Sequence, residues 1–310
     1  MNLILVTLGG IVFSFVEVDE SLKKRFLEEF PAALARAEDR CSKIKGLARI
    51  STTNDEVRRS PGNPVQFAVN SPSRKFEFSL SATLQSGTRT LHYVYCLAGD
   101  KSFNLQREGD RPYSIKGLGG DMVAESSFRT IFGKYLDASW SSLGGRYSDL
   151  LKSKNFKITK IVENSGTGIN LVDVEFEAGQ FNGTPLQYKI RLDPANDWAV
   201  IESELRLGPP PLSEVVKIDY GSNRVGGSSY PSVITFKGID GKRERCEFER
   251  VDFDSVNLDE FQIEYYGLRD VSSTGWDWLH RVLWWLVATG IIALLLVGSV
   301  IFKKMANRRR

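Results

Sequence analysis

Carboxylate side chains recur at alternate positions in several segments, and this spacing is the one that could support acid–base chemistry. Residues two apart on a β-strand lie on the same face, so two carboxylates placed in this way could serve as the acid and the base of a hydrolase. The carboxylates concerned are Asp173, Glu175, Glu177, Glu202, Glu204, Glu247 and Glu249. Solvated acidic residues show the same alternation, and the sequence gives no sign of a buried setting for any of these. The pattern therefore favours an outer strand face over a catalytic pair.

Histidine and cysteine offer little further chemistry. The two histidines are His92, on the polar side of an alternating segment, and His280, beside an apolar run; the sequence identifies no Ser or Cys partner for either. Cys41, Cys96 and Cys246 are too few and too far apart for a zinc site or a disulfide scaffold, and the odd number leaves at least one free thiol. The motifs HExxH, CxxC, GxSxG, GxGxxG and the Walker loop are absent. We therefore expect no catalytic residue, no metal site and no cofactor.

The charge distribution argues against a nucleic-acid partner. The 310 residues include 41 Lys+Arg and 38 Asp+Glu, for a net charge of +3. Five of the positive charges lie at the C-terminus, in Lys303, Lys304, Arg308, Arg309 and Arg310. The rest of the chain is close to neutral, so the sequence shows no basic face of the kind that nucleic acids require.

An amphipathic helix is predicted near the beginning of the chain. Asp19 is a plausible N-cap, and Pro31 is expected to kink or interrupt the helix. The apolar residues recur at steps of three and four, in Leu22, Phe26, Phe30, Ala33, Leu34, Ala37, Cys41 and Ile44. We expect this apolar stripe to pack on a sheet.

Strands dominate the remainder, because apolar and polar residues alternate with a period of two. Helical spacing returns only at 128–136 and 146–152, which predicts a central pair of helices. The predicted strands lie at 65–69, 76–82, 91–97, 103–105, 172–178, 186–192, 198–207, 216–220, 233–236 and 246–251, with a last extended piece at 261–268. Together they indicate one mostly antiparallel domain over residues 19–268.

Two local features of the second strand group can be predicted in register. Aligned as a hairpin, the strands at 172–178 and 186–192 place Asp173 opposite Arg191 and Glu175 opposite Lys189, which gives the acidic row a pairing role on the outer face. In the next strand the parity of the apolar positions changes, which predicts a β-bulge near 200–201.

The C-terminal segment predicts a transmembrane helix. Val282–Phe302 is a run of 21 residues without a charge; as a helix it would be about 31 Å long, close to the ~30 Å of a bilayer core. A buried core helix or a removable sorting tail are the alternatives. Membrane-interface residues flank the run, with Trp276, Trp278, Trp284 and Trp285 near one end and Lys303, Lys304, Arg308, Arg309 and Arg310 beyond the other.

The orientation follows from the basic residues. The five cations of the tail, 303–310, outnumber Arg269 and Arg281 on the other side, which places the tail in the cytoplasm. The apolar segment within residues 1–18 then serves as a signal peptide, with an uncleaved anchor or a wrongly assigned start codon as alternatives. Residues 269–281 are the juxtamembrane linker. We expect a single-pass cell-membrane protein whose bulk is periplasmic or extracellular; a tail-anchored protein with a cytosolic domain fits the charge bias less well.

The order of elements resembles the LolA-like half-barrel superfamily of lipoprotein carriers and sigma-factor regulators of the RseB type. The segments that carry the resemblance are 186–204, a strand, an Asp-containing turn and a strand, and 230–236, Tyr-Pro-Ser-Val-Ile-Thr-Phe. The C-terminal layout also resembles planctomycete membrane-anchored proteins. The resemblance implies a mainly β (α+β) fold with a large curved antiparallel sheet, half-barrel-like, roofed by helices.

The resemblance also implies that the concave face could bind acyl chains or an apolar peptide segment. The candidate lining residues are Phe76, Phe78, Leu91, Tyr93, Tyr95, Val174, Phe176, Tyr188 and Ile190. An ordinary packed core would show the same pattern.

Three functions stay open at this point. The first is a membrane-tethered binding or sensing module without catalytic activity, with the membrane and a lipid, a lipoprotein or another envelope protein as partners. The second is a structural or protein-interaction ectodomain without a small ligand, and the third is a hydrolase with an unrecognised site. A ligand binder requires a continuous apolar pocket, whereas an interaction module has a filled core and an exposed patch.

Overall fold

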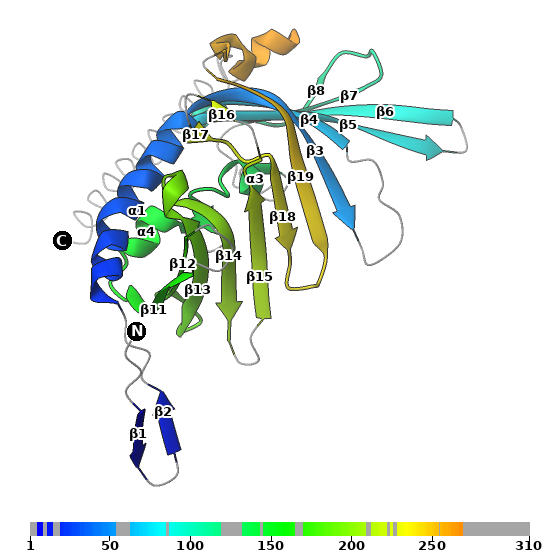
Figure 1. Cartoon of the computed structure of the whole chain (residues 1–310). Coiled ribbons are helices and arrows are strands. Elements are labelled where there is room, and N and C mark those ends of the chain that lie inside the picture. The colour runs from blue at the N-terminus through cyan, green and yellow to red at the C-terminus, as the bar shows by residue number, and fades with distance from the viewer. Residues whose placement is uncertain are drawn as a thin grey trace, which may run out of the picture. The chain divides into compact units, whose positions relative to one another are not determined.

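The computed structural model describes two units of the chain, Met1–Phe261 and Gln262–Arg310 (Figure 1). The described residues are 5–8, 11–14, 19–53, 63–84, 87–118, 132–142, 145–164, 170–208, 212–221, 224–225, 228–253 and 255–268. The predicted linker, transmembrane helix, interfacial tryptophans and basic tail, 269–310, lie outside them. Within the described ranges, no helix combines the length and the apolar character needed to cross a bilayer.

The first unit is built on one antiparallel sheet of 13 described strands. In pairing order these are β11 (Lys157–Asn164), β12 (Leu171–Phe181), β13 (Thr184–Asp193), β14 (Ala199–Leu207), β15 (Leu212–Asp219), β18 (Val233–Lys237), β19 (Arg243–Phe253), β3 (Lys43–Thr53), β4 (Asn63–Asn70), β5 (Ser73–Leu84), β6 (Gly87–Leu97), β7 (Phe103–Glu108) and β8 (Ser114–Leu118). The mainly β fold predicted from the sequence is confirmed. The sheet consists of two meanders, a first one of strands β3–β8 and a second one of strands β11–β15, β18 and β19. They meet where β19, the last strand along the chain, pairs with β3, the first.

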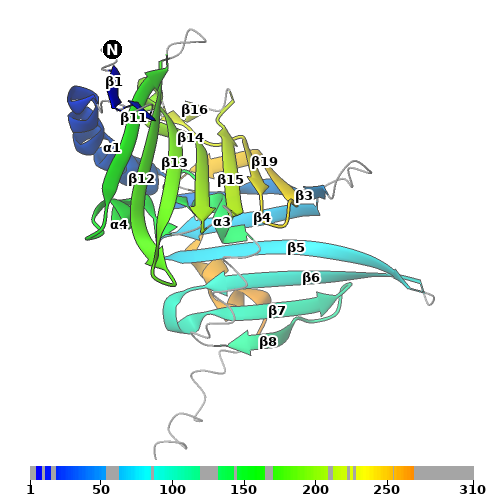
Figure 2. The same cartoon turned by 90° about the horizontal axis from the view of Figure 1, so that it is seen from below.

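The sheet is strongly curved, and short helices lie on its hollow side. Figures 1 and 2 show it bending around α3 (Lys134–Leu136) and α4 (Tyr147–Leu151), with α1 (Glu20–Arg40) along the border of the hollow. The smaller elements are the hairpins β1 (Leu5–Leu8) with β2 (Ile11–Ser14), β9 (Ser141–Ser142) with β10 (Gly145–Arg146) and β16 (Arg224–Val225) with β17 (Ser228–Ser229), and the 3₁₀ turns η1 (Gly99–Lys101), η3 (Pro194–Asn196) and η4 (Leu258–Phe261). The curved antiparallel sheet expected from the resemblance is therefore present.

Helix α1 begins as the sequence predicts. The Asp19 carboxylate accepts hydrogen bonds from the Ser21 and Leu22 amides at 3.0 and 3.1 Å, as an N-cap does. An interruption at Pro31 and a helix that extends to Ile44 were both wrong. The helix continues without interruption through Pro31, and it ends at Arg40 with Cys41 as the C-cap. Ile44, which the helical spacing had included, lies in β3: the Ser42 amide donates to the Asp39 carbonyl three residues back instead of four, and the chain is extended from Lys43.

The central helical pair is found where it is described. Of the first predicted helix, 128–136, the structure describes 132–136, which is π-helical at 132–133 and forms α3 at Lys134–Leu136; α4 agrees with the second predicted helix to one residue at each end. The extended piece expected at 261–268 is wrong. In the second unit, residues 263–266 form the 3₁₀ turn η5 (Ile263–Tyr266), which ends at Gly267 with a φ of +75°, a value that glycine adopts without strain.

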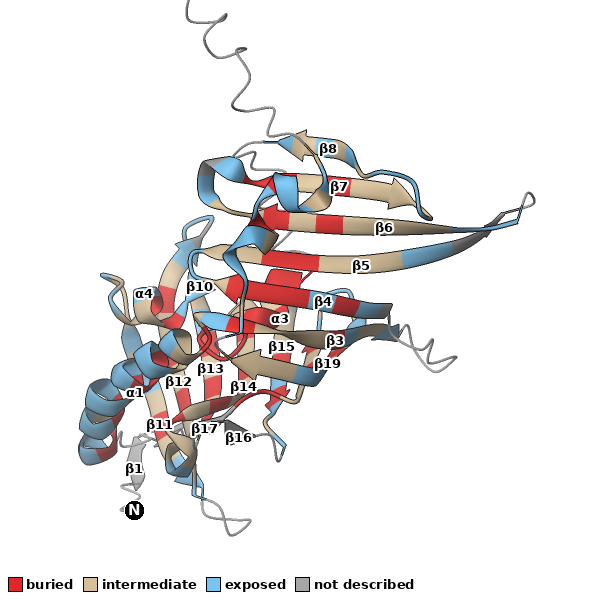
Figure 3. Ribbon diagram, turned by 90° about the horizontal axis from the view of Figure 1, so that it is seen from above, coloured by how far each residue is buried: buried red, intermediate tan, exposed pale blue. Residues whose placement is uncertain are grey.

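The predicted register of the second meander is confirmed. In the β12–β13 hairpin Asp173 lies opposite Arg191 and Glu175 opposite Lys189, and Arg191 Nε donates to Asp173 Oδ1 at 2.8 Å. The bulge also occurs at the expected place: Arg191 pairs with Glu202, while the next residue of β13 pairs with Val200, so Ile201 is the extra residue. Buried side chains therefore continue on the inner face across the change of parity, as the red bands of β12–β14 in Figure 3 show.

The core fills the hollow of the sheet. Phe26 and Phe30 of α1 are fully buried, with ring centroids 5.1 Å apart, and Phe30 lies 6.1 Å from the ring of Tyr147 in α4. Phe132, fully buried before α3, packs on Phe67 and Phe76 of the first meander at 5.4 and 5.8 Å. All three cysteines are buried and free.

Candidate functional site

The predicted lining residues of the second meander belong to the packed core. Val174 and Phe176 of β12 and Tyr188 and Ile190 of β13 are each at most 2 % exposed. The ring of Phe176 stacks on Tyr188 at 5.0 Å and contacts Phe156 at 5.4 Å. These side chains fill the space between the sheet and the helices at this end.

The predicted residues of the first meander form an aromatic ladder, the stacked rings of Phe76, Phe78, Tyr93 and Tyr95. Phe76 stacks on Tyr95 at 4.8 Å and Phe78 on Tyr93 at 5.2 Å, because these residues lie opposite each other on β5 and β6. The ladder runs from the core, where Phe76 is fully buried, to partly exposed positions. Leu91, opposite Leu80, continues it outward.

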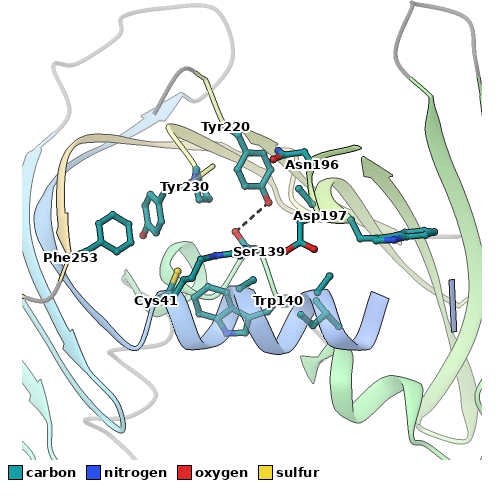
Figure 4. Close-up of a pocket in the computed structure, with 15 residues that line it drawn as sticks. Cys41, Ser139, Trp140, Asn196, Asp197, Tyr220, Tyr230 and Phe253 are labelled. Carbon is teal, nitrogen blue, oxygen red and sulfur yellow. Dashed lines mark hydrogen bonds and ion pairs between the residues drawn. The ribbon is translucent and has the colours of Figure 1, made fainter. Parts of the chain in front are cut away.

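None of the predicted lining residues borders the cavity beside α1. The cavity at the boundary of helix and sheet lies elsewhere, beside the C-terminal half of α1, and measures about 40 Å³. We call it the α1 cavity. It is lined by Ala33, Leu34, Ala37, Arg40, Cys41, Ser139, Trp140, Asn196, Asp197, Trp198, Ala199, Tyr220, Tyr230, Pro231 and Phe253 (Figure 4).

The turn between β13 and β14 supplies one wall of the α1 cavity. Asp193 caps the 3₁₀ turn η3 by accepting from the Ala195 amide at 3.0 Å. The next two residues, Asp197 and Trp198, have φ of +55° and +56°, a left-handed conformation that is uncommon outside glycine. This backbone directs Asp197 and Trp198 toward α1, where the Trp198 indole N–H donates to Glu29 Oε2 at 2.7 Å.

Charged side chains close the rim of the cavity and form what we call the latch, Arg36, Arg40 and Asp197. Arg36 Nε donates to Asp197 Oδ2 at 3.2 Å and Arg40 Nη1 to the same oxygen at 3.4 Å. The hydrogen bond from Arg36 is the main reason why the pKa of Asp197 is lowered. The latch joins α1 to the β13–β14 turn.

Apart from Arg40 and Asp197 of the latch, the residues that line the α1 cavity are uncharged. The Tyr220 hydroxyl lies 3.2 Å from the Val200 carbonyl oxygen and 3.4 Å from Ser139 Oγ, the contact drawn in Figure 4. Burial raises the pKa of Tyr220 and of the Cys41 thiol to about 12 each. The thiol is therefore protonated at neutral pH and is a poor nucleophile. The cavity suits contact with an apolar group rather than chemistry on it.

Sequence reasoning missed most of this site. Trp140 and Phe253 come to the cavity from segments that showed no functional pattern, and only the β13–β14 turn had been recognised as a turn. One signal was present: Arg36 and Arg40, four residues apart, share a helix face, and an acidic residue at the end of a tight turn is a suitable partner for both.

Comparison with known proteins gives likenesses in structure alone. Neither the family models nor the curated proteins include a match. Among solved structures, a LolA superfamily protein from Nitrosomonas europaea is similar with a TM-score of 0.42 and 8 % identity, over 76 % of this chain and 97 % of that one. A putative outer membrane lipoprotein-sorting protein domain from Vibrio parahaemolyticus gives 0.43 and 10 %, over 77 % and 98 %. The Mycobacterium tuberculosis lipoprotein LppX gives 0.27 and 10 %, over 76 % and 99 %. The likeness to LolA superfamily proteins expected from the order of elements is thus found.

Proposed function

We propose that this chain is a non-catalytic, membrane-tethered binding module outside the cytoplasm, which takes an acyl chain of a lipid or lipoprotein between α1 and the concave face of the sheet. The observation that carries the proposal is the α1 cavity: a space at a helix–sheet boundary that is lined largely by aromatic and aliphatic side chains, with the charged latch at its rim.

The cavity is small in this structure. Its volume of about 40 Å³ is well below the roughly 300 Å³ at which small-molecule sites begin. Binding of an acyl chain therefore requires the C-terminal half of α1 to move away from Trp140, Tyr230 and Phe253.

The contacts of α1 favour movement of that half. The N-terminal half is held by Phe26 and Phe30, both fully buried. The C-terminal half presents the small side chains Ala33 and Ala37 to the cavity, and Pro31, which lacks an amide hydrogen, stands between the halves. The latch is exposed to solvent, since the side chain of Arg36 is 53 % exposed, and exposed ion pairs contribute at most about 1 kcal/mol each.

Binding of a dansyl-labelled fatty acid to the full chain in amphipol tests the proposal. We expect saturable binding, and we expect Ala37→Phe, which fills the cavity, to weaken it at least tenfold. Leu27→Phe is the matched control, because Leu27 lies on the same helix and is 41 % exposed. Circular dichroism verifies that both variants fold. Saturable binding that is equal in Ala37→Phe and the wild type would place the ligand elsewhere and contradict the proposal.

A protein-interaction ectodomain is the second candidate, and the filled interior favours it. The outer end of the aromatic ladder, where Leu80 is 38 % exposed and Phe78 and Tyr93 are partly exposed, offers an apolar surface for a partner. The same binding experiment, with mass spectrometry of an organic extract of the purified chain, separates the two functions. Absence of both co-purifying lipid and saturable fatty-acid binding would favour the interaction module.

A further inference from the structure

A second groove lies on the first meander, and its lining includes Phe78 and Tyr93 of the aromatic ladder as well as polar residues of the opposite strand face. Side chains alternate along β5, so Glu77 and Ser79 point away from the face that carries Phe76 and Phe78. The groove has a volume of about 310 Å³, which falls in the range of small-molecule sites. Its polar lining residues are Gln66, Glu77, Ser79, His92, Arg107 and Tyr113.

Three of these residues form a row across neighbouring strands. Ser79 lies opposite His92, and His92 lies opposite Arg107. Ser79 Oγ is 2.7 Å from His92 Nδ1. The hydroxyl either donates to Nδ1 or accepts from it, depending on the tautomer of the ring; in the neutral tautomer in which it donates, the hydrogen is on Nε2 and the ring keeps a donor for a ligand. Ser79 thereby fixes the orientation of the ring.

Arg107 brings a positive charge to this row. Its guanidinium carbon lies 4.7 Å from the centroid of the Tyr113 ring, a cation–π contact that holds the group in place. Its Nε is buried and has no hydrogen-bond partner, and no carboxylate of the described residues forms an ion pair with Arg107. A buried donor without a partner is costly, which is a reason to look for a ligand.

The acidic residue of the groove, Glu77, is held by another cation. Its carboxylate lies 2.8 Å from the ammonium of Lys75, which also contacts Glu260 at 2.7 Å. A planar guanidinium presents paired donors that match the oxygens of a carboxylate or a phosphate.

We propose that this groove binds a small molecule bearing a phosphate monoester or a carboxylate, whose anionic group is held by the guanidinium of Arg107 and the Nε2 hydrogen of His92. The site is separate from the α1 cavity and does not depend on the function proposed for it. A phosphate could come from a soluble metabolite or from a lipid headgroup, and the chemistry of recognition is shared.

Isothermal titration of the full chain in amphipol with inorganic phosphate, acetate and glycerol 3-phosphate tests this proposal. We expect saturable binding of at least one probe and a loss of at least tenfold in affinity for Arg107→Met, because hydrogen bonds to charged groups contribute about 1.5–3 kcal/mol. Arg111→Met is the matched control: Arg111 lies in the same β7–β8 hairpin, its side chain is 76 % exposed, and it pairs with Glu108 outside the groove. Arg107→Lys should retain part of the affinity.

Other outcomes are equally decisive. Failure of all three probes to bind, or equal binding in Arg107→Met and the wild type, would overturn the proposal. If Arg107→Met does not fold, His92→Phe and Ser79→Ala replace it, and both should weaken binding. Dihexanoyl phosphatidic acid distinguishes the sources: tighter binding than glycerol 3-phosphate supports a headgroup, and equal binding supports a soluble anion. Hydrolysis of a p-nitrophenyl ester that is lost in Ser79→Ala would overturn a purely binding role.

Discussion

Release of the latch should open the α1 cavity, and Cys41 is placed to report it. Cys41 lines the cavity, is 9 % exposed and has its pKa raised by burial to about 12, so it should react slowly with N-ethylmaleimide in the closed state. Asp197→Asn removes the charge shared by Arg36 and Arg40. With the side chain of Asp197 33 % exposed, solvent screening limits the two ion pairs to about 1 kcal/mol together.

That free energy sets the size of the expected effect. About 1 kcal/mol corresponds to a roughly fivefold change in the opening equilibrium, so Cys41 should be labelled about five times faster in Asp197→Asn. The rate is measured by peptide mass spectrometry, which separates Cys41 from Cys96 and Cys246, at 1 % and 0 % exposure.

The control variant is Glu28→Gln, which removes another exposed ion pair of α1, with Lys24, without touching the cavity. It should leave the rate unchanged. An unchanged Cys41 rate in Asp197→Asn would refute the reasoning about the latch. An equal rise at all three cysteines would show general unfolding instead of movement of α1.

Three further predictions concern pH, stability and topology. The pKa of Asp197 is lowered in the folded state, so the latch contributes its full stability above about pH 3.8, the ordinary pKa of an aspartate. This stability is lost as the pH falls through the lowered folded-state pKa. The labelling of Cys41, divided by that of Cys96, should therefore rise only in that acidic range. Lys75→Met leaves Glu77 and Glu260, which the ammonium contacts at 2.8 and 2.7 Å, without this partner, and should lower the free energy of unfolding in urea by about 3 kcal/mol, whereas Lys154→Met, at an exposed position, should change it little. Protease added to intact spheroplasts should degrade residues 19–281; protection until lysis would reverse the proposed orientation.

The register of the second meander could be predicted because it depends on residues that are close together in the sequence. Alternating charges on β12 and β13 leave one alignment in which Asp173 meets Arg191, and the change of parity at Ile201 requires a bulge. The N-cap at Asp19 is equally local. Period-two rows place a side chain on a face, but they do not say whether the opposite space is filled, which is why the core positions of Val174 and Phe176 could not be separated from a cavity lining.

The sites arise from residues that meet only in the folded chain. Arg36 and Asp197 are joined across the domain by a left-handed turn, and Trp140 reaches the same cavity from the segment after α3. The partner of His92 was missed because Ser79 becomes its neighbour only through the β5–β6 pairing. In the same way, the end of α1 depends on where β3 must begin, and the helical spacing of Ile44 carried no information about that.

The pairing of β19 with β3 at the centre of the sheet, which we call the seam, affects how the protein folds during synthesis. Strand β3 is synthesised early, but its second edge pairs with β19, so Thr53 meets Arg243 and Ile44 meets Phe253. During synthesis the first meander therefore carries an open strand edge in the middle of the future sheet, and such edges invite pairing with other chains. The seam also tolerates little alteration: a Cβ on Gly46 would lie 2.0 Å from the Arg250 carbonyl oxygen. A nascent chain that stops before residue 243 contains all of β3–β8 but lacks β19, the strand that covers the open edge of β3.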